Sequence, residues 1–129
     1  MAFMLYSSNH VPDFEYLPCS AITPKIGMAL TQTTGNLAIA TGTTKPTYIS
    51  MCEKSAACTA GDIIPVIRIE DDMVFETNFS ASASSIKLGN KVTLHASDGM
   101  QVTATTSSGV AEVVYMDGTA SGSMCRVRF

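Results

Sequence analysis

Four acidic residues lie close together near the middle of the chain: Glu70, Asp71, Asp72 and Glu76. Carboxylate oxygens are preferred ligands of Ca²⁺ and Mg²⁺, so the cluster is a candidate cation site. It lacks the regularly spaced Asp and Asn residues and the turn glycine of a calcium-binding loop. We therefore expect a solvated acidic bend between two strands, with no bound metal.

The two histidines, His10 and His95, are candidate general bases. A catalytic base needs a neighbouring acid or nucleophile, and no Ser or Cys lies at a recognised spacing from either histidine. The chain also has no phosphate-binding Gly-x-x-x-x-Gly-Lys-Ser/Thr loop and no Gly-x-Ser-x-Gly nucleophile elbow. We expect a protein that is not an enzyme and carries no cofactor.

The four cysteines are Cys19, Cys52, Cys58 and Cys125. They form no Cys-x-x-Cys pair, and only Cys52 and Cys58 lie near one another in sequence, so a structural zinc site is not indicated. Free cysteine is among the most buried residue types. We expect reduced, buried thiols in a protein made in a reducing compartment.

The composition of the 129-residue chain restricts its partners. It is 46% apolar and 15% charged, which favours one folded domain over a disordered tail or a coiled coil. A net charge of -3 gives no field to hold nucleic acid or an anionic membrane surface. The sequence has no membrane-spanning apolar run and no signal-peptide pattern at its start. We expect neither nucleic acid nor membrane as a partner.

From residue 26 onward, short apolar runs alternate with turn residues, which is typical of an all-β fold. The pattern predicts a compact small barrel or sandwich of about 8–9 short strands, forming a single β-rich domain over residues 26–129. The expected strands are 26–30, 37–40, 47–52, 63–69, 73–79, 91–95, 100–105, 110–116 and 124–129.

Turn residues predict how some of these strands connect. Asp98-Gly99 suits a type I′ hairpin that pairs 91–95 antiparallel with 100–105, and Gly35-Asn36 suits a hairpin as well. Pro65 predicts an edge strand or a bulge, because proline cannot donate a ladder hydrogen bond. The stretch 80–85, rich in Ser and Ala, predicts a crossing loop between an earlier and a later group of strands.

The first 25 residues differ from the rest and predict an extended N-terminal arm. Its aromatic residues, Phe3, Tyr6, Phe14 and Tyr16, follow no helical or strand period, and prolines interrupt any helix. So much aromatic surface seeks a partner. The arm therefore either packs back on its own domain or docks on another chain.

The last expected strand alternates, so that Arg126 and Arg128 share one face. Two arginines on one face could bind carboxylates of a partner chain, although a plain solvated face is the simpler interpretation.

Three segments carry a resemblance to a known family: the run from Gly42 to Ile69, the sequence DMVFET at 72–77 and the sequence GVAEVVY at 109–115. Together they resemble small head decoration proteins of tailed bacteriophages, particularly those infecting Firmicutes. The resemblance covers about residues 26–129. It implies a non-enzymatic virion protein whose copies, commonly trimers, sit on the outer face of the expanded capsid and hold neighbouring major capsid proteins together.

The first hypothesis is therefore capsid decoration. The arm, through Phe3, Tyr6, Phe14 and Tyr16, would dock on the major capsid protein, while sister copies form a homotrimer with Arg126 and Arg128 as candidate contacts. The expected location is the outer surface of a virion assembled in the host bacterial cytoplasm. Alternatives are another virion β module, from a tail tube, neck or fibre, and a carbohydrate-binding surface module, which the lack of Trp disfavours.

Overall fold

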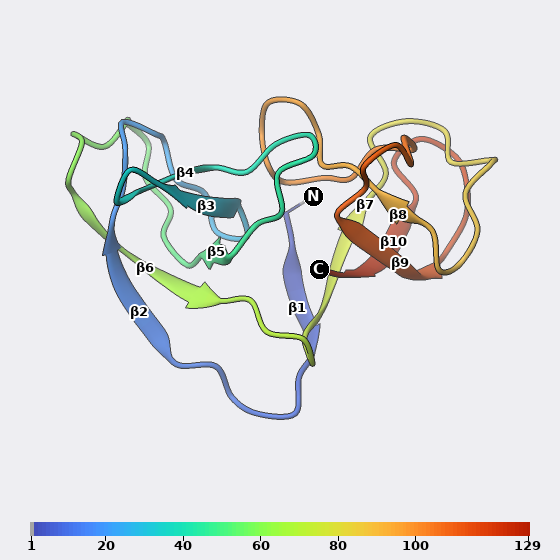
Figure 1. Cartoon of the computed structure of the whole chain (residues 1–129), viewed down its shortest axis with the longest axis horizontal. Helices are drawn as coiled ribbons and strands as arrows, with labels where there is room; N and C mark the ends of the chain where they lie inside the picture. Colours follow the sequence, from blue (N-terminus) through green and yellow to red (C-terminus); the bar gives the residue numbers. More distant parts are fainter. Residues whose placement is uncertain (1) are drawn as a thin grey trace.

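The computed structural model describes residues 2–129, in which all regular structure is β-strand. Two antiparallel five-stranded sheets have the orders β1-β7-β10-β9-β8 and β2-β6-β5-β3-β4, and lie side by side in Figure 1. The all-β prediction is confirmed. The strands are β1 (Met4–Ser7), β2 (Phe14–Pro18), β3 (Ala29–Thr33), β4 (Asn36–Ile39), β5 (Tyr48–Ser50), β6 (Ile63–Arg68), β7 (Val74–Asn78), β8 (Lys91–Val92), β9 (Ala111–Met116) and β10 (Met124–Arg128).

The sheet of β2 to β6 curls around its own apolar core. A parallel bridge between Cys19 and Leu37, together with the hydrogen bond from Ser20 N to Leu37 O at 2.9 Å, connects β2 with β4 at the two ends of the sheet. Alternation along each strand sends one set of side chains inward. The buried core consists of Cys19, Met28, Leu30, Leu37, Tyr48, Cys58, Ile64 and Val66.

The second sheet curls in the same way and shares its core with the first. Bridges from Val102 to both Leu94 and Phe79 connect the continuation of β8 with that of β7. Ile49 and Ile67, which point outward from the first sheet, are buried in this second core. The apolar outer face of one sheet therefore holds the two sheets together.

Residues 2–25 are extended and belong to both sheets. β1 pairs with β7 in the second sheet, and β2 pairs with β6 in the first. Phe3 is 1% exposed and contacts Phe129 edge to face, with ring centroids 5.3 Å apart. The aromatic N-terminal segment therefore packs back on its own chain, which was the first of the two alternatives expected from the sequence.

This topology makes the chain cross between the sheets twice. The link from β1 to β2 leaves the second sheet, and the link from β6 to β7 returns to it, as the lower part of Figure 1 shows. The division between the two groups of strands thus falls between Arg68 and Val74. The expectation that residues 80–85 divide them is wrong, because that loop connects β7 and β8 within one sheet.

Most expected strands exist at slightly different bounds. Each predicted range overlaps an observed strand except 100–105, where Val102 makes only isolated bridges. The antiparallel bridge from Leu94 to Val102 confirms that this range pairs with 91–95. Its turn is not type I′, because Gly99 has a positive φ of 61° and Asp98 does not.

Two other local predictions need correction. Thr33 pairs with Asn36, so the turn between β3 and β4 is Thr34-Gly35, one residue earlier than predicted, and both residues have positive φ. Pro65 lies in β6, which has β2 and β5 on either side, so its strand is not at an edge. The last pair between β5 and β6 is Ser50 with Val66, so that ladder ends just before proline would interrupt it.

Candidate functional site

An apolar stripe runs along the outer face of β2 and β6. Cross-strand pairs place side chains on one face, and here Phe14 pairs with Ile67 and Tyr16 with Pro65, while Pro18 pairs with Ile63. Phe14 is 51% exposed, Tyr16 66% and Ile63 57%. We call Phe14, Tyr16, Pro18, Ile63 and Pro65 the β2–β6 stripe.

The stripe continues toward β1 through a small apolar hollow. Phe14 lines this cavity of about 100 Å³ together with Met4, Leu5, Pro12 and Ile26. All four residues of β1 are exposed, because the strand is at the edge of its sheet. The N-terminal segment therefore presents a connected apolar surface although Phe3 anchors it in the core.

A stack of two tyrosines and one arginine covers the second sheet. The Arg126 guanidinium lies 3.7 Å from the ring centroid of Tyr6 and 4.5 Å from that of Tyr115. Arg126 Nε also donates a hydrogen bond of 2.9 Å to Glu76 Oε2. Cation–π contacts and an ion pair hold the Arg126 side chain in place. These contacts are all with residues of its own chain.

Arg128 has a different setting, at a hollow of about 230 Å³ that Lys45 and Lys91 also line. Glu112 is the one acidic side chain of this lining, and its Oε1 lies 4.0 Å from Arg128 Nη1. An exposed ion pair at that distance contributes little to stability. The hollow therefore keeps an excess of positive charge that suits a carboxylate of another chain.

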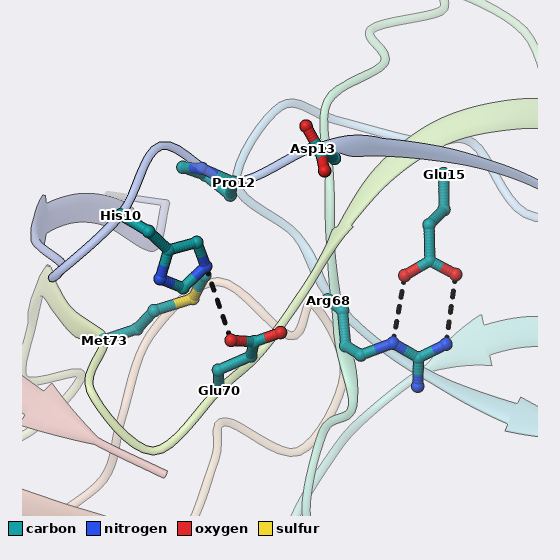
Figure 2. Close-up of a pocket in the computed structure, with 7 residues that line it drawn as sticks. All are labelled: His10, Pro12, Asp13, Glu15, Arg68, Glu70 and Met73. Carbon is teal, nitrogen blue, oxygen red and sulfur yellow. Dashed lines mark hydrogen bonds and ion pairs between the residues drawn. The ribbon is translucent and has the colours of Figure 1, made fainter.

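A polar pocket of about 310 Å³ lies where the β1–β2 link and the β6–β7 link meet. We call these two links the first and the second crossover. Figure 2 shows Arg68 donating two parallel hydrogen bonds to Glu15, Nε to Oε2 at 2.9 Å and Nη2 to Oε1 at 3.0 Å. It also shows His10 facing Glu70, with Nε2 and Oε2 3.3 Å apart. These contacts connect the start of β2 with the end of β6.

The other side of the His10 ring meets a serine and an aspartate. Nδ1 lies 3.1 Å from Asp72 Oδ2 and 3.4 Å from Ser8 Oγ, which itself donates to Asp72 at 3.1 Å. In a nucleophile-activating triad the hydroxyl and the carboxylate contact opposite ring nitrogens. Here Ser8 Oγ and Asp72 Oδ2 both lie at Nδ1 while Glu70 Oε2 lies at Nε2, and the Ser8 hydroxyl donates to Asp72.

Asp72 is the hub of this cluster. Its Oδ2 accepts a hydrogen bond of 2.7 Å from the Asn9 backbone N–H, which lowers the pKa of the Asp72 carboxyl below its usual value. The Ser8 hydroxyl and the charge of His10 lower the same pKa further. The Asp72 carboxylate, in the β6–β7 link, is therefore hydrogen-bonded to Ser8 and Asn9 in the β1–β2 link.

One group of side chains within residues 2–129 has a composition that could hold a metal ion. The ligand atoms of His10, Glu70 and Asp72 lie within 4.8 Å of one another. Each already has a hydrogen-bond or ion-pair partner inside the cluster. We interpret the group as a polar clamp that connects the β1–β2 link with the β6–β7 link. Glu76, the fourth acid of the sequence cluster, lies apart from it in β7.

The structure separates the residues singled out in the sequence. Phe14 and Tyr16 share the β2–β6 stripe, Tyr6 joins Arg126 in the stack, and Phe3 is buried, so it cannot contact a partner directly. Sequence reasoning missed Ile63, Tyr115, Lys45 and Lys91. Only strand register brings these residues beside the others. The one available signal was the alternation from Phe14 to Pro18, which is typical of a strand.

Comparison with known proteins leaves the chain without a family assignment. No family model matches it, and no curated protein matches it in sequence. Within the described residues there is no helix long and apolar enough to cross a membrane.

Proposed function

We propose that the protein is a structural virion component that decorates and stabilises a bacteriophage head by binding the outer surface of the major capsid protein shell. The β2–β6 stripe is the observation that carries the proposal, alongside the sequence resemblance to head decoration proteins. In this proposal the protein acts by surface complementarity, without catalysis and without a cofactor.

The stripe has the properties of a protein-binding surface. Tyr16 and Phe14 are large, aromatic and more than half exposed, although the fold has two apolar cores in which such side chains could be buried. Aromatic residues dominate the binding energy of protein interfaces, and connected exposed apolar surface marks such interfaces. β2 belongs to the N-terminal segment, so the segment retains the docking role expected of the arm.

Phe3 supports docking indirectly in this proposal. It anchors β1 against Phe129, which also contacts Phe75, and this holds Met4 and Leu5 beside the hollow next to Phe14. Tyr6 is held by Arg126, which orients its exposed ring. The aromatic residues thus divide into one anchor and several surface contacts.

The cationic hollow beside Arg128 supports contacts between sister copies. The protein carries more acidic than basic residues, 11 against 8, so another copy offers many carboxylates to the hollow. We propose a homotrimer on the capsid surface in which Arg128, with Lys45 and Lys91, binds a neighbour's carboxylate. Binding at several points also raises the effective concentration of each weak contact.

Co-sedimentation with expanded capsids lacking the protein tests the role of the stripe. We expect Tyr16→Ser to weaken binding at least about 30-fold, since truncating an aromatic hot spot costs about 2 kcal/mol or more. The matched control is Leu88→Ser, because Leu88 is 61% exposed but lies outside the stripe. Its binding should equal that of the wild type.

Circular dichroism and thermal melting must show both variants folded. Equal binding by Tyr16→Ser and wild type would exclude the stripe as the docking surface. No binding by the wild-type protein would exclude the proposed function itself.

A further inference from the structure

Two buried thiols lie side by side in the core of the first sheet. Cys19 is fully buried and Cys58 nearly so, and both belong to the same apolar cluster. The Cys58 side chain lies close enough to Cys19 to raise the pKa of the Cys19 thiol, as the largest cause after burial. Both cysteines are in the thiol form in the structure.

Backbone hydrogen bonds hold the two cysteines in this position. Cys19 N donates to Asp62 O and Gly61 N donates to Cys19 O, both at 2.8 Å. On the other side of Cys19, Cys58 N donates to Ile22 O at 2.8 Å. Backbone hydrogen bonds therefore connect the chain around Cys19 with the loop before β6. They lie on both sides of the two thiols.

We propose that Cys19 and Cys58 form a disulfide when the protein meets an oxidising disulfide compound such as glutathione disulfide. The bond would covalently attach the N-terminal segment, through the end of β2, to the loop that precedes β6. The proposal does not depend on the proposed capsid role.

The reaction is an ordinary thiol–disulfide exchange in two steps. The Cys58 thiolate attacks one sulfur of glutathione disulfide, forming a mixed disulfide and releasing one glutathione thiolate. The Cys19 thiolate then attacks the Cys58 sulfur and releases the second glutathione. Two protein thiols lose two electrons and two protons, and one glutathione disulfide becomes two glutathione thiols.

Burial controls the rate of this step. It raises the pKa of the Cys19 thiol to about 11, and the adjacent Cys58 thiol adds to the rise. The Cys19 thiolate that attacks in the second step is therefore scarce at neutral pH, and closure of the disulfide should accelerate as the pH rises from 7 to 9. Cys58, the slightly more exposed of the two, is the thiol that meets the oxidant first.

Cys125 provides the matched control. It is also fully buried, and burial raises the pKa of its thiol to about 12, but it lies in the other core. Cys125→Ser should oxidise as the wild type does. Cys58→Ser should form no intramolecular disulfide.

The test is incubation of the full chain with glutathione disulfide, followed by thiol counting and tryptic mapping without reduction. Trypsin cuts after Lys25, Lys54 and Arg68, so Cys19, Cys52 and Cys58 fall in three different peptides. We expect the free thiols to fall from four to two, with peptide 1–25 linked to peptide 55–68. Closing this loop should raise the melting temperature by roughly 5 to 10 °C.

Four remaining thiols, a stable mixed disulfide with glutathione, or a link that involves Cys52 would each overturn the proposal. Because the peptide map is made on the wild-type chain, a folding defect in a serine variant leaves the test intact.

Discussion

At the scale of single residues, the backbone at Gly27 determines how the N-terminal strand attaches. Phe3 N donates a hydrogen bond of 2.9 Å to Gly27 O, and Gly27 has a φ of +85°. A Cβ on this glycine would lie 2.5 Å from Ala2 Cβ and 2.9 Å from Phe3 O. Only glycine allows the first residues to approach this closely.

We predict that Gly27→Ala lowers the free energy of unfolding by about 2–5 kcal/mol, combining left-handed backbone strain with overpacking. The control is Gly122→Ala, because Gly122 has a φ of +88° and nothing within 4 Å of an added Cβ. Gly122→Ala should lower the free energy of unfolding by about 1–2 kcal/mol, from left-handed backbone strain alone. Urea unfolding measures both, and equal losses would show that the close approach of residues 2 and 3 is unimportant.

Asp72 gives the clamp between the crossovers a pH dependence. Its pKa is lower in the folded protein than in the unfolded chain, so its contribution to stability is present above the unfolded pKa and is lost as the pH falls. We predict that Asp72→Asn is less stable than wild type at pH 7, and that the difference in stability closes as the pH falls below the unfolded pKa of about 4.

Urea unfolding across this pH range checks the Asp72 prediction, with Asp71→Asn as the control because Asp71 is the exposed neighbour in the same turn. A stability gap between wild type and Asp72→Asn that stays constant down to pH 2 would contradict the account of the clamp.

At the scale of elements, the turn between β3 and β4 carries a suboptimal residue. Thr34 has a φ of 50°, a conformation that disfavours β-branched side chains. We predict that Thr34→Asn raises the free energy of unfolding by about 1 kcal/mol, because Asn-Gly is the preferred pair for this turn. Thr33→Asn, one residue earlier in β3, should lower it, since Thr favours strands. Chemical denaturation of both variants decides the matter.

The strands themselves were predictable where local pattern determines them. Alternation in 63–69 and the turn residues near Gly35 indicated the observed elements to within a few residues. β1 and β2 were missed because Pro12 and Pro18 and the uneven spacing of the other aromatic residues obscured the short alternation from Phe14 to Pro18. Their stability comes from tertiary contacts such as those of Phe3, which no local pattern contains.

The candidate site was predictable only in part for the same reason. Tyr16 and Phe14 were identifiable as aromatic residues in search of a partner, but their alignment with Ile63 depends on the register of β2 and β6. Likewise, His10 meets Glu70 and Asp72 only because the two crossovers run together. Long-range register is the information that the sequence pattern lacks.

At the scale of the whole molecule, residues 2–25 both complete the two sheets and form part of the exposed surface. β1 and β2 complete one sheet each, while Tyr6, Phe14 and Tyr16 remain exposed on them. Removing the segment to test its binding role would therefore also remove Phe3 and Cys19 from the two cores. Single surface substitutions separate binding from folding.

The most direct test of the proposed function is a mass-spectrometric copy count on purified phage particles that encode this chain. We predict a copy number comparable to that of the major capsid protein, because a decoration protein covers the whole shell. A copy number as low as that of a neck or tail-tip component, or absence from the particles, would contradict the proposal.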